Sequence, residues 1–285
     1  MTFSNILMTL INGIELGLIY ALIAIGFSLI FGTAKIIFAA HGEMYMVGAM
    51  LTYYFYVVKG IPYFYTVLII MLITGIFGLI IDRLIFRKLY GKDLPLFMVS
   101  LGLSIVISSI FLIMFNGMSK GVPAPIPGYI KLMDANIAIF KLIVAFISLG
   151  LITGLHFFFQ NSKIGQSIRA FSQDPIAATL QGISINRIVP IVFFVSLPLA
   201  GVAGALVAPI YFAQVYMGTQ ALSTIIMVVI LGGIGSFPGA IAGGLFIGIF
   251  QAIGSLIIGK LSTLLSFVLI IIFLIFKPKG FFGKD

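Results

Sequence analysis

The longest stretch of this chain without an acidic or basic side chain runs from Ile188 to Gly259. A helix crosses a bilayer with about 20 apolar residues, so this stretch is long enough for about three crossings. The whole chain is also apolar and poor in charge, since 61% of its 285 residues are hydrophobic and only 8% are charged. Soluble domains carry about 25% charged residues. We therefore expect an all-α integral membrane protein.

Other charge-poor runs predict the remaining crossings. These runs are Leu16–Ala34 with Ile6–Ile14 before it, Met44–Val58, Ile61–Ile81, Leu94–Ser119, Leu142–Ser162 and Leu261–Phe276. In total they predict about eight or nine transmembrane helices, with Leu222–Leu231 either crossing or re-entering. Breaks inside the long charge-free stretch are expected at Gly and Pro, such as Pro198 and Gly232-Gly233.

Basic residues predict the orientation. Every arginine falls in segments 82–93 and 160–187, and further lysines lie in the C-terminal tail. These segments are expected in the cytoplasm, because cytoplasmic loops are enriched in Lys and Arg. The net charge of +9 then reflects membrane orientation and not binding to nucleic acid. The Pro- and Gly-rich segment 117–137 faces outward, as a structured cover or a docking rim.

A first interrupted segment is AAHGEMYMVGA, residues 39–49. The residues from Glu43 to Val58 reach only about 22 Å as a helix, short of a full crossing. This helix is therefore expected to begin inside the membrane, with Gly42 allowing the sharp turn. Glu43 then lies in the first helical turn, where the helix dipole favours a negative charge.

A second interrupted segment is GGIGSFPGAIAGG, residues 232–244. Ser236 is expected to cap the following helix, with Pro238 in its first turn. Its glycines recur every fourth residue and let another helix approach closely. Broken segments in two halves, about 1–116 and 138–276, predict a transport pathway near the midplane. The predicted pathway residues are Glu15, His41, Gly42, Glu43, Tyr45, Gly233, Gly235, Ser236, Pro238 and Gly239.

The buried ionisable residues allow other interpretations. His41 and Glu43 either line a hydrated vestibule or sit at the membrane interface as helix caps. Glu15 either faces a water-filled space or belongs to an interfacial first turn. One histidine and one carboxylate are too few ligands for a metal, so no metal or other cofactor is expected.

The cytoplasmic loop 160–187 contains a predicted short helix. Asp174 is the expected cap, Pro175 the first turn, and Gly182 the stop. The face of this helix is formed by Ile176, Ala177 and Leu180, with Ala178 beside it. A helix this short is marginal in water by itself and needs a surface to pack on. That surface is either the rest of this chain or the lipid headgroups, or else the groove of a partner protein.

The chain lacks motifs for chemistry of its own. It contains no G-x-x-x-x-G-K-[ST] loop for nucleotide phosphates, no H-E-x-x-H and no G-x-S-x-G. We therefore expect neither ATP hydrolysis nor another catalytic site, and an intramembrane enzyme lacks a nucleophile and base.

Several motifs together resemble one family. GLIYALIAIGFSLIFG (17–32), FAAHGEMYMVGA (38–49), SKIGQSIRAFSQDPIAATLQGI (162–183), VVILGGIGSFPGAIAGG (228–244) and KPKGFFG (277–283) resemble the permeases of branched-chain amino-acid ABC transporters. Ile176 stands where that family often has a glutamate. The resemblance implies one permease domain over residues 1–285 in the inner (plasma) membrane.

The resemblance also implies partners and residue roles. Such a permease pairs with a second, related permease, two ATP-binding subunits and an external substrate-binding protein. The helix near 175–181 would be the coupling helix, formed with Asp174, Pro175, Ala177, Ala178, Leu180 and Gly182. The alternative is a stand-alone secondary transporter or channel for small neutral solutes, driven through Glu15, His41 and Glu43. A mostly apolar path suits branched-chain amino acids, but also other neutral amino acids, amides or urea.

Overall fold

The computed structural model describes residues 3–132, 135–278 and 280–282, which are mostly helical. The α-helices in chain order are α1 (Phe3–Ala34), α2 (His41–Thr52), α3 (Tyr63–Leu84), α4 (Asp93–Phe115), α5 (Ile139–Asn161), α6 (Lys163–Gln173), α7 (Pro175–Leu180), α8 (Ile185–Val207), α9 (Met217–Gly232), α10 (Phe237–Ile258) and α11 (Ser262–Phe276). A π-helical turn, η1 (Tyr53–Val58), extends α2, and 3-10 turns η2 (Phe86–Leu89) and η3 (Gly259–Leu261) lie beside α3 and α11.

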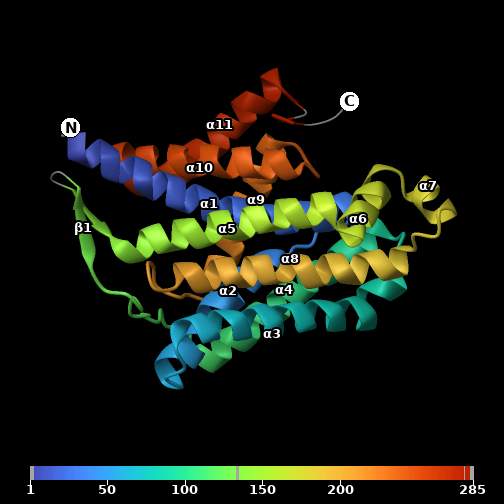
Figure 1. Ribbon diagram of the computed structural model, residues 1–285, viewed down its shortest axis with the longest axis horizontal. Helices are drawn as coiled ribbons and strands as arrows, with labels where there is room; N and C mark the ends of the chain where they lie inside the picture. Colours follow the sequence, from blue (N-terminus) through green and yellow to red (C-terminus); the bar gives the residue numbers. More distant parts are fainter. Residues whose placement is uncertain (1–2, 133–134, 279, 283–285) are drawn as a thin grey trace.

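The long helices lie side by side along the longest axis of the molecule (Figure 1). Helices α1, α3, α4, α5, α8 and α10 are long and apolar enough to cross a membrane. The predicted eight or nine crossings therefore exceed the six full-length helices among the described residues, because α2, α9 and α11 are shorter. The break predicted at Pro198 is wrong, since this proline lies inside α8.

Glycines set the close packing of the central helices. A Cβ atom at Gly17 of α1 would lie 2.8 Å from the Cα atom of Leu245 on α10. A Cβ atom at Gly48 of α2 would meet the backbone of Gly201 on α8, and one at Gly243 of α10 would lie 2.5 Å from the carbonyl oxygen of Val228 on α9. Backbones approach this closely only where side chains are absent, so glycine supplies the interfaces.

The opposite ends of the molecule carry its two non-spanning features (Figure 1). At one end, β1 (Tyr129–Leu132) and β2 (Ala135–Ala138) form an antiparallel hairpin in the segment predicted as a cover, so the chain is not purely helical. Lys120 and Ala213 exchange backbone hydrogen bonds of 2.9 and 3.0 Å there. At the other end, α6 and α7 extend beyond the bundle. The hairpin and α7 are thus separated by the length of the spanning helices.

Candidate functional site

The segment before α2 is non-helical backbone that is mostly buried, apart from Lys35 and Ile37. Phe38 and Ala40 are fully buried, and the Ala39 N–H donates to the Ser100 hydroxyl of α4 at 3.2 Å. Buried backbone of this kind must find partners inside the protein, because lipid offers none. α2 then begins at His41 with Glu43 in its first turn, as the sequence predicts.

His41 is completely buried between aromatic rings. Its Nε2 atom lies 3.1 Å from the carbonyl oxygen of Ile23 on α1, and Phe27 and Phe38 meet its ring edge-on. Because a carbonyl oxygen only accepts, Nε2 is the protonated nitrogen. The ring is thus out of contact with water in this structure, whichever depth of the membrane it occupies. His41 joins α1 to α2 and touches protein on all sides.

Glu43 lies where the first turns of α2 and α9 meet. One oxygen, Oε1, accepts a hydrogen bond from the Ser104 hydroxyl of α4 at 3.0 Å, and Oε2 finds no hydrogen-bond partner within the described ranges. A Cβ atom at Gly218 of α9 would collide with Oε2, and one at Gly42 would lie 2.8 Å from the Leu222 Cβ atom. The carboxylate therefore faces the start of α9, where the helix dipole favours negative charge.

Glu15 is buried and paired with a lysine from a distant segment. Its Oε2 atom lies 3.8 Å from the Nζ atom of Lys141 on α5, and Lys141 also donates to the Asn12 Oδ1 atom at 2.8 Å. Asn12 and Lys141 line a cavity of about 350 Å³ that is also bordered by the β2 residue Asn136. This cavity lies beside Lys141 and not around the Glu15 carboxylate, which is buried.

Further polar side chains face one another between α1 and α10, and sequence reasoning missed them. The Tyr20 hydroxyl donates to Gln251 Oε1 at 2.9 Å. Tyr45 of α2, by contrast, is a predicted pathway residue, and it is buried against α8, where a Cβ atom at Gly204 would meet its carbonyl oxygen. Tyr20 and Gln251 are separated by most of the chain, so no local pattern in the sequence could have paired them.

The second interrupted segment lies between α9 and α10. Ser236 caps α10, accepting from the Gly239 N–H at 3.1 Å, and Pro238 lies in the first turn, as predicted. Gly233 and Gly235 have positive φ angles of 99° and 79°, which glycine adopts without strain.

The C-terminal tail stabilises this turn. The Phe281 N–H donates to the Leu231 carbonyl at 2.8 Å, and the Phe282 N–H to the Gly232 carbonyl at 3.0 Å. These bonds satisfy carbonyl groups that the end of α9 leaves free. Residues of the C-terminal motif thus belong to the α9–α10 break, which the sequence alone did not indicate.

Helix α7 has the predicted caps, and its predicted face of Ile176, Ala177 and Leu180 is exposed. Asp174 Oδ1 accepts from the N–H groups of Ile176 and Ala177 at 2.9 and 3.0 Å, with Pro175 at the first position. Gly182 ends the turn with a φ of 83°.

Ala178 of α7, predicted beside the docking face, is only 5% exposed and packs on this chain. Ile176 and Leu180 are instead 77% and 83% exposed. The apolar surface that α7 offers to another molecule is therefore formed by Ile176 and Leu180 with the smaller Ala177, and Ala178 seats the helix.

The described residues contain no cluster of His, Asp or Glu that could hold a metal ion. The polar groups instead form separate contacts: the Glu15–Lys141 pair, the junction of α2 and α9, and the α9–α10 break. Polar side chains buried among spanning helices in this way commonly border the path of a solute.

Residues 9–274 match the family model described as the permease component of the branched-chain amino acid transport system. The chain is 30% identical to the high-affinity branched-chain amino acid transport system permease protein BraD of Pseudomonas aeruginosa, over 98% of this chain and 96% of BraD. It is 29% identical to LivH of Escherichia coli K12, which carries the same description, over 99% and 97% of the two chains. No solved structure is significantly similar.

These matches cover nearly the whole chain and do not depend on one motif. Together with the six long apolar helices, they identify a multi-pass protein of the inner membrane. The chain belongs to the family of permease components of branched-chain amino acid transport systems.

Proposed function

We propose that this permease forms part of the membrane channel of an ATP-driven importer for branched-chain amino acids. The observation that carries the proposal is the full-length similarity to BraD and LivH, whose names give that substrate class. The substrate suits the chain, because a path with few fixed charges passes a zwitterion with an apolar side chain at low cost.

The partners we propose are a second, related permease, two ATP-binding subunits and an external substrate-binding protein. This chain lacks a nucleotide-binding loop, so the energy must come from another subunit. The hairpin end suits the external binding protein, and the α7 end suits the ATP-binding subunits (Figure 1).

We further propose that α2, α9 and α11 also traverse part or all of the membrane, giving about nine crossings. α2 and α9 begin against each other at Gly42 and Gly218, as two half-helices that start inside the membrane would do. The pathway would border Glu15, Glu43, Tyr45 and the 233–239 break, with His41 holding α2 in register against α1.

Helix α7 is the proposed coupling helix. Ile176 and Leu180 expose apolar side chains that gain free energy when a groove covers them. Movement of a partner that holds these side chains would be transmitted through α6 to α5 and through α8 to the core. Access would then alternate between the two sides of the membrane.

The stand-alone transporter finds less support. A chain driven by protons through Glu15, His41 and Glu43 needs these groups to exchange with water, yet each is at most 2% exposed. Glu15 is also paired with Lys141, and His41 with a backbone carbonyl.

Reconstitution tests the proposal. The four kinds of subunit are placed in liposomes with ATP inside, and uptake of labelled leucine, isoleucine and valine is measured with one component omitted at a time. We expect uptake only with all components present, and competition among the three amino acids. Uptake by this chain alone would support the stand-alone alternative, and transport of an amide or urea in preference to leucine would overturn the substrate assignment.

A further inference from the structure

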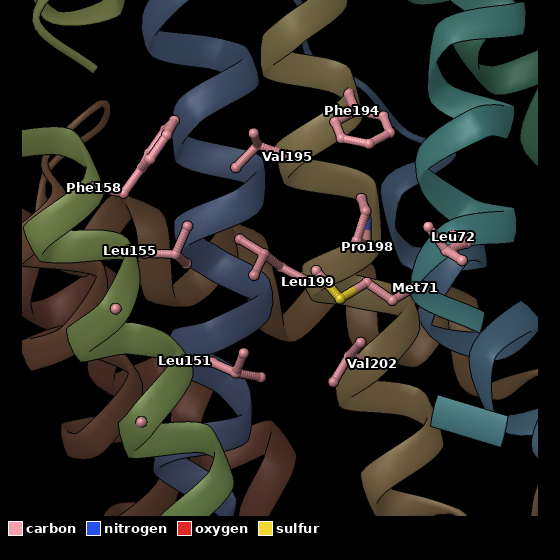
Figure 2. Close-up of a pocket in the computed structure, with 12 residues that line it drawn as sticks. Met71, Leu72, Leu151, Leu155, Phe158, Phe194, Val195, Pro198, Leu199 and Val202 are labelled. Atoms are coloured by element: carbon pink, nitrogen blue, oxygen red, sulfur yellow. The ribbon is translucent and has the colours of Figure 1, made fainter. Parts of the chain in front are cut away.

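An apolar groove lies between three spanning helices, away from the proposed pathway residues. Its floor is α8, and α3 and α5 form its walls (Figure 2). Leu151, Leu155 and Phe158 of α5 face α8, and Met71 and Leu72 approach from α3 (Figure 2). No charged residue lines it, and its volume is about 340 Å³.

The groove stays open because small residues line the α5 wall. Cβ atoms at Gly150 and Gly154 would meet nothing within 4 Å, so neighbouring side chains do not fill the space beside them. Phe194, on the α8 side, is 41% exposed, and Leu72 is 58% exposed. The groove therefore opens sideways from the bundle, toward whatever surrounds the spanning helices.

The volume of the groove distinguishes a helix from a lipid acyl chain as its occupant. A helix about 10–12 Å across would fill 340 Å³ with only about 3–4 Å of its length, less than one turn. A neighbouring transmembrane helix could therefore lie across the opening of the groove but not sit inside it. A flexible hydrocarbon chain is narrow enough to do so, and lipid is the solvent of these helices.

A cation lies at the end of the groove nearest α7. Arg187 is in the first turn of α8 and is exposed, and the described residues place no carboxylate within ion-pair distance of it. Helical periodicity puts Arg187 on the same face of α8 as Phe194, Pro198 and Val202, which line the groove. Phe194 is seven residues further on, about 10 Å along the helix.

We propose that this groove binds one anionic phospholipid, with an acyl chain against α5 and α8 and the phosphate on Arg187. A guanidinium binds phosphate through paired N–H donors, and near a membrane surface one Arg raises the affinity for anionic lipid about fivefold. The site would fill the space between α5 and α8, while α3 packs directly on α8 at Gly75 and Gly78. The inference is independent of the transported substrate.

The test measures phospholipid retained by the purified full chain. The protein is exchanged into lipid-free detergent, titrated with dioleoyl phosphatidylglycerol or its phosphatidylcholine counterpart, and analysed by native mass spectrometry. Wild type is expected to retain one phosphatidylglycerol molecule. Gly150→Leu combined with Gly154→Leu is expected to lower the affinity at least tenfold, because leucine side chains occupy the groove. Gly102→Leu on α4, where a Cβ atom also meets nothing within 4 Å, is the matched control and should bind as wild type does.

Arg187→Gln tests the headgroup contact separately. Because Arg187 is exposed, this variant keeps the fold even if the leucine variant does not. Affinity for phosphatidylglycerol should fall about fivefold while that for phosphatidylcholine stays the same. Lys277→Gln removes another exposed cation and should change neither. Unchanged retention in the leucine variant or in Arg187→Gln would overturn the proposal, as would a cross-link from Gly154→Cys to a partner subunit in the assembled transporter.

Discussion

Replacing Lys141 with methionine should destabilise the protein by leaving the Glu15 carboxylate buried without a cation. The Nζ and Oε2 atoms are 3.8 Å apart, and Glu15 is 1% exposed. At an effective dielectric constant of about 20, two unit charges at this distance attract by about 4 kcal/mol. Removal of one partner from a buried pair costs about 3–5 kcal/mol, because the remaining charge is uncompensated.

The assay is thermal unfolding of the purified chain in detergent, followed by circular dichroism. For a chain of this size, we expect Lys141→Met to lower the Tm by roughly 10 °C. Glu15→Gln combined with Lys141→Met removes both charges, and it should recover most of this loss. Lys131→Met, on the hairpin and outside any described ion pair, is the matched control and should leave the Tm unchanged. Equal destabilisation in the single and double variants would refute the reasoning, because the cost would then not be electrostatic.

Three further predictions concern the other contacts. Gly218→Ala should impair folding, because the added Cβ atom meets the Glu43 side chain. In a double-mutant cycle of Tm values, Glu43→Ala should partly rescue this variant, and additive effects of the two changes would contradict the contact. Ile176→Ala combined with Leu180→Ala should weaken binding of the ATP-binding subunits by about 4 kcal/mol, roughly a thousandfold in Kd, as measured by titration. The Tm of the double variant should not change, and an unchanged affinity would argue against α7 as the docking helix. Gly280→Val should loosen the tail, since a Cβ atom there would lie 2.6 Å from the Gly233 nitrogen, and faster proteolysis at the C-terminus would reveal it; wild-type resistance would contradict this.

Features that depend on neighbouring residues could be predicted from the sequence. Asp174 and Ser236 were expected as caps and Glu43 in a first turn, and all three lie there. A short polar side chain before a helix binds free N–H groups within three residues, so the signal is contained in a few positions. The apolar composition fixed the membrane class for the same reason, since it needs no knowledge of contacts.

Features that depend on distant residues could not be predicted. Glu15 was recognised as unusual, but Lys141 comes from another helix far along the chain, and no periodicity relates the two. Ala178 was placed beside the docking face because a six-residue helix has too few positions to show which side is covered. The predicted runs at α2, α9 and α11 form shorter helices than the six long ones, since hydropathy measures how apolar a run is but not where its helix begins.

The central claim is that α7 transmits the action of ATP-binding subunits to this channel. Because the chain has no cysteine, Leu180→Cys provides a single thiol on the exposed face of α7. Its reaction with a membrane-impermeant maleimide is measured in right-side-out and inverted vesicles, with and without the ATP-binding subunits. We predict labelling only in inverted vesicles, and protection when these subunits are bound. Labelling from the outer side, or no protection by the assembled subunits, would contradict the account.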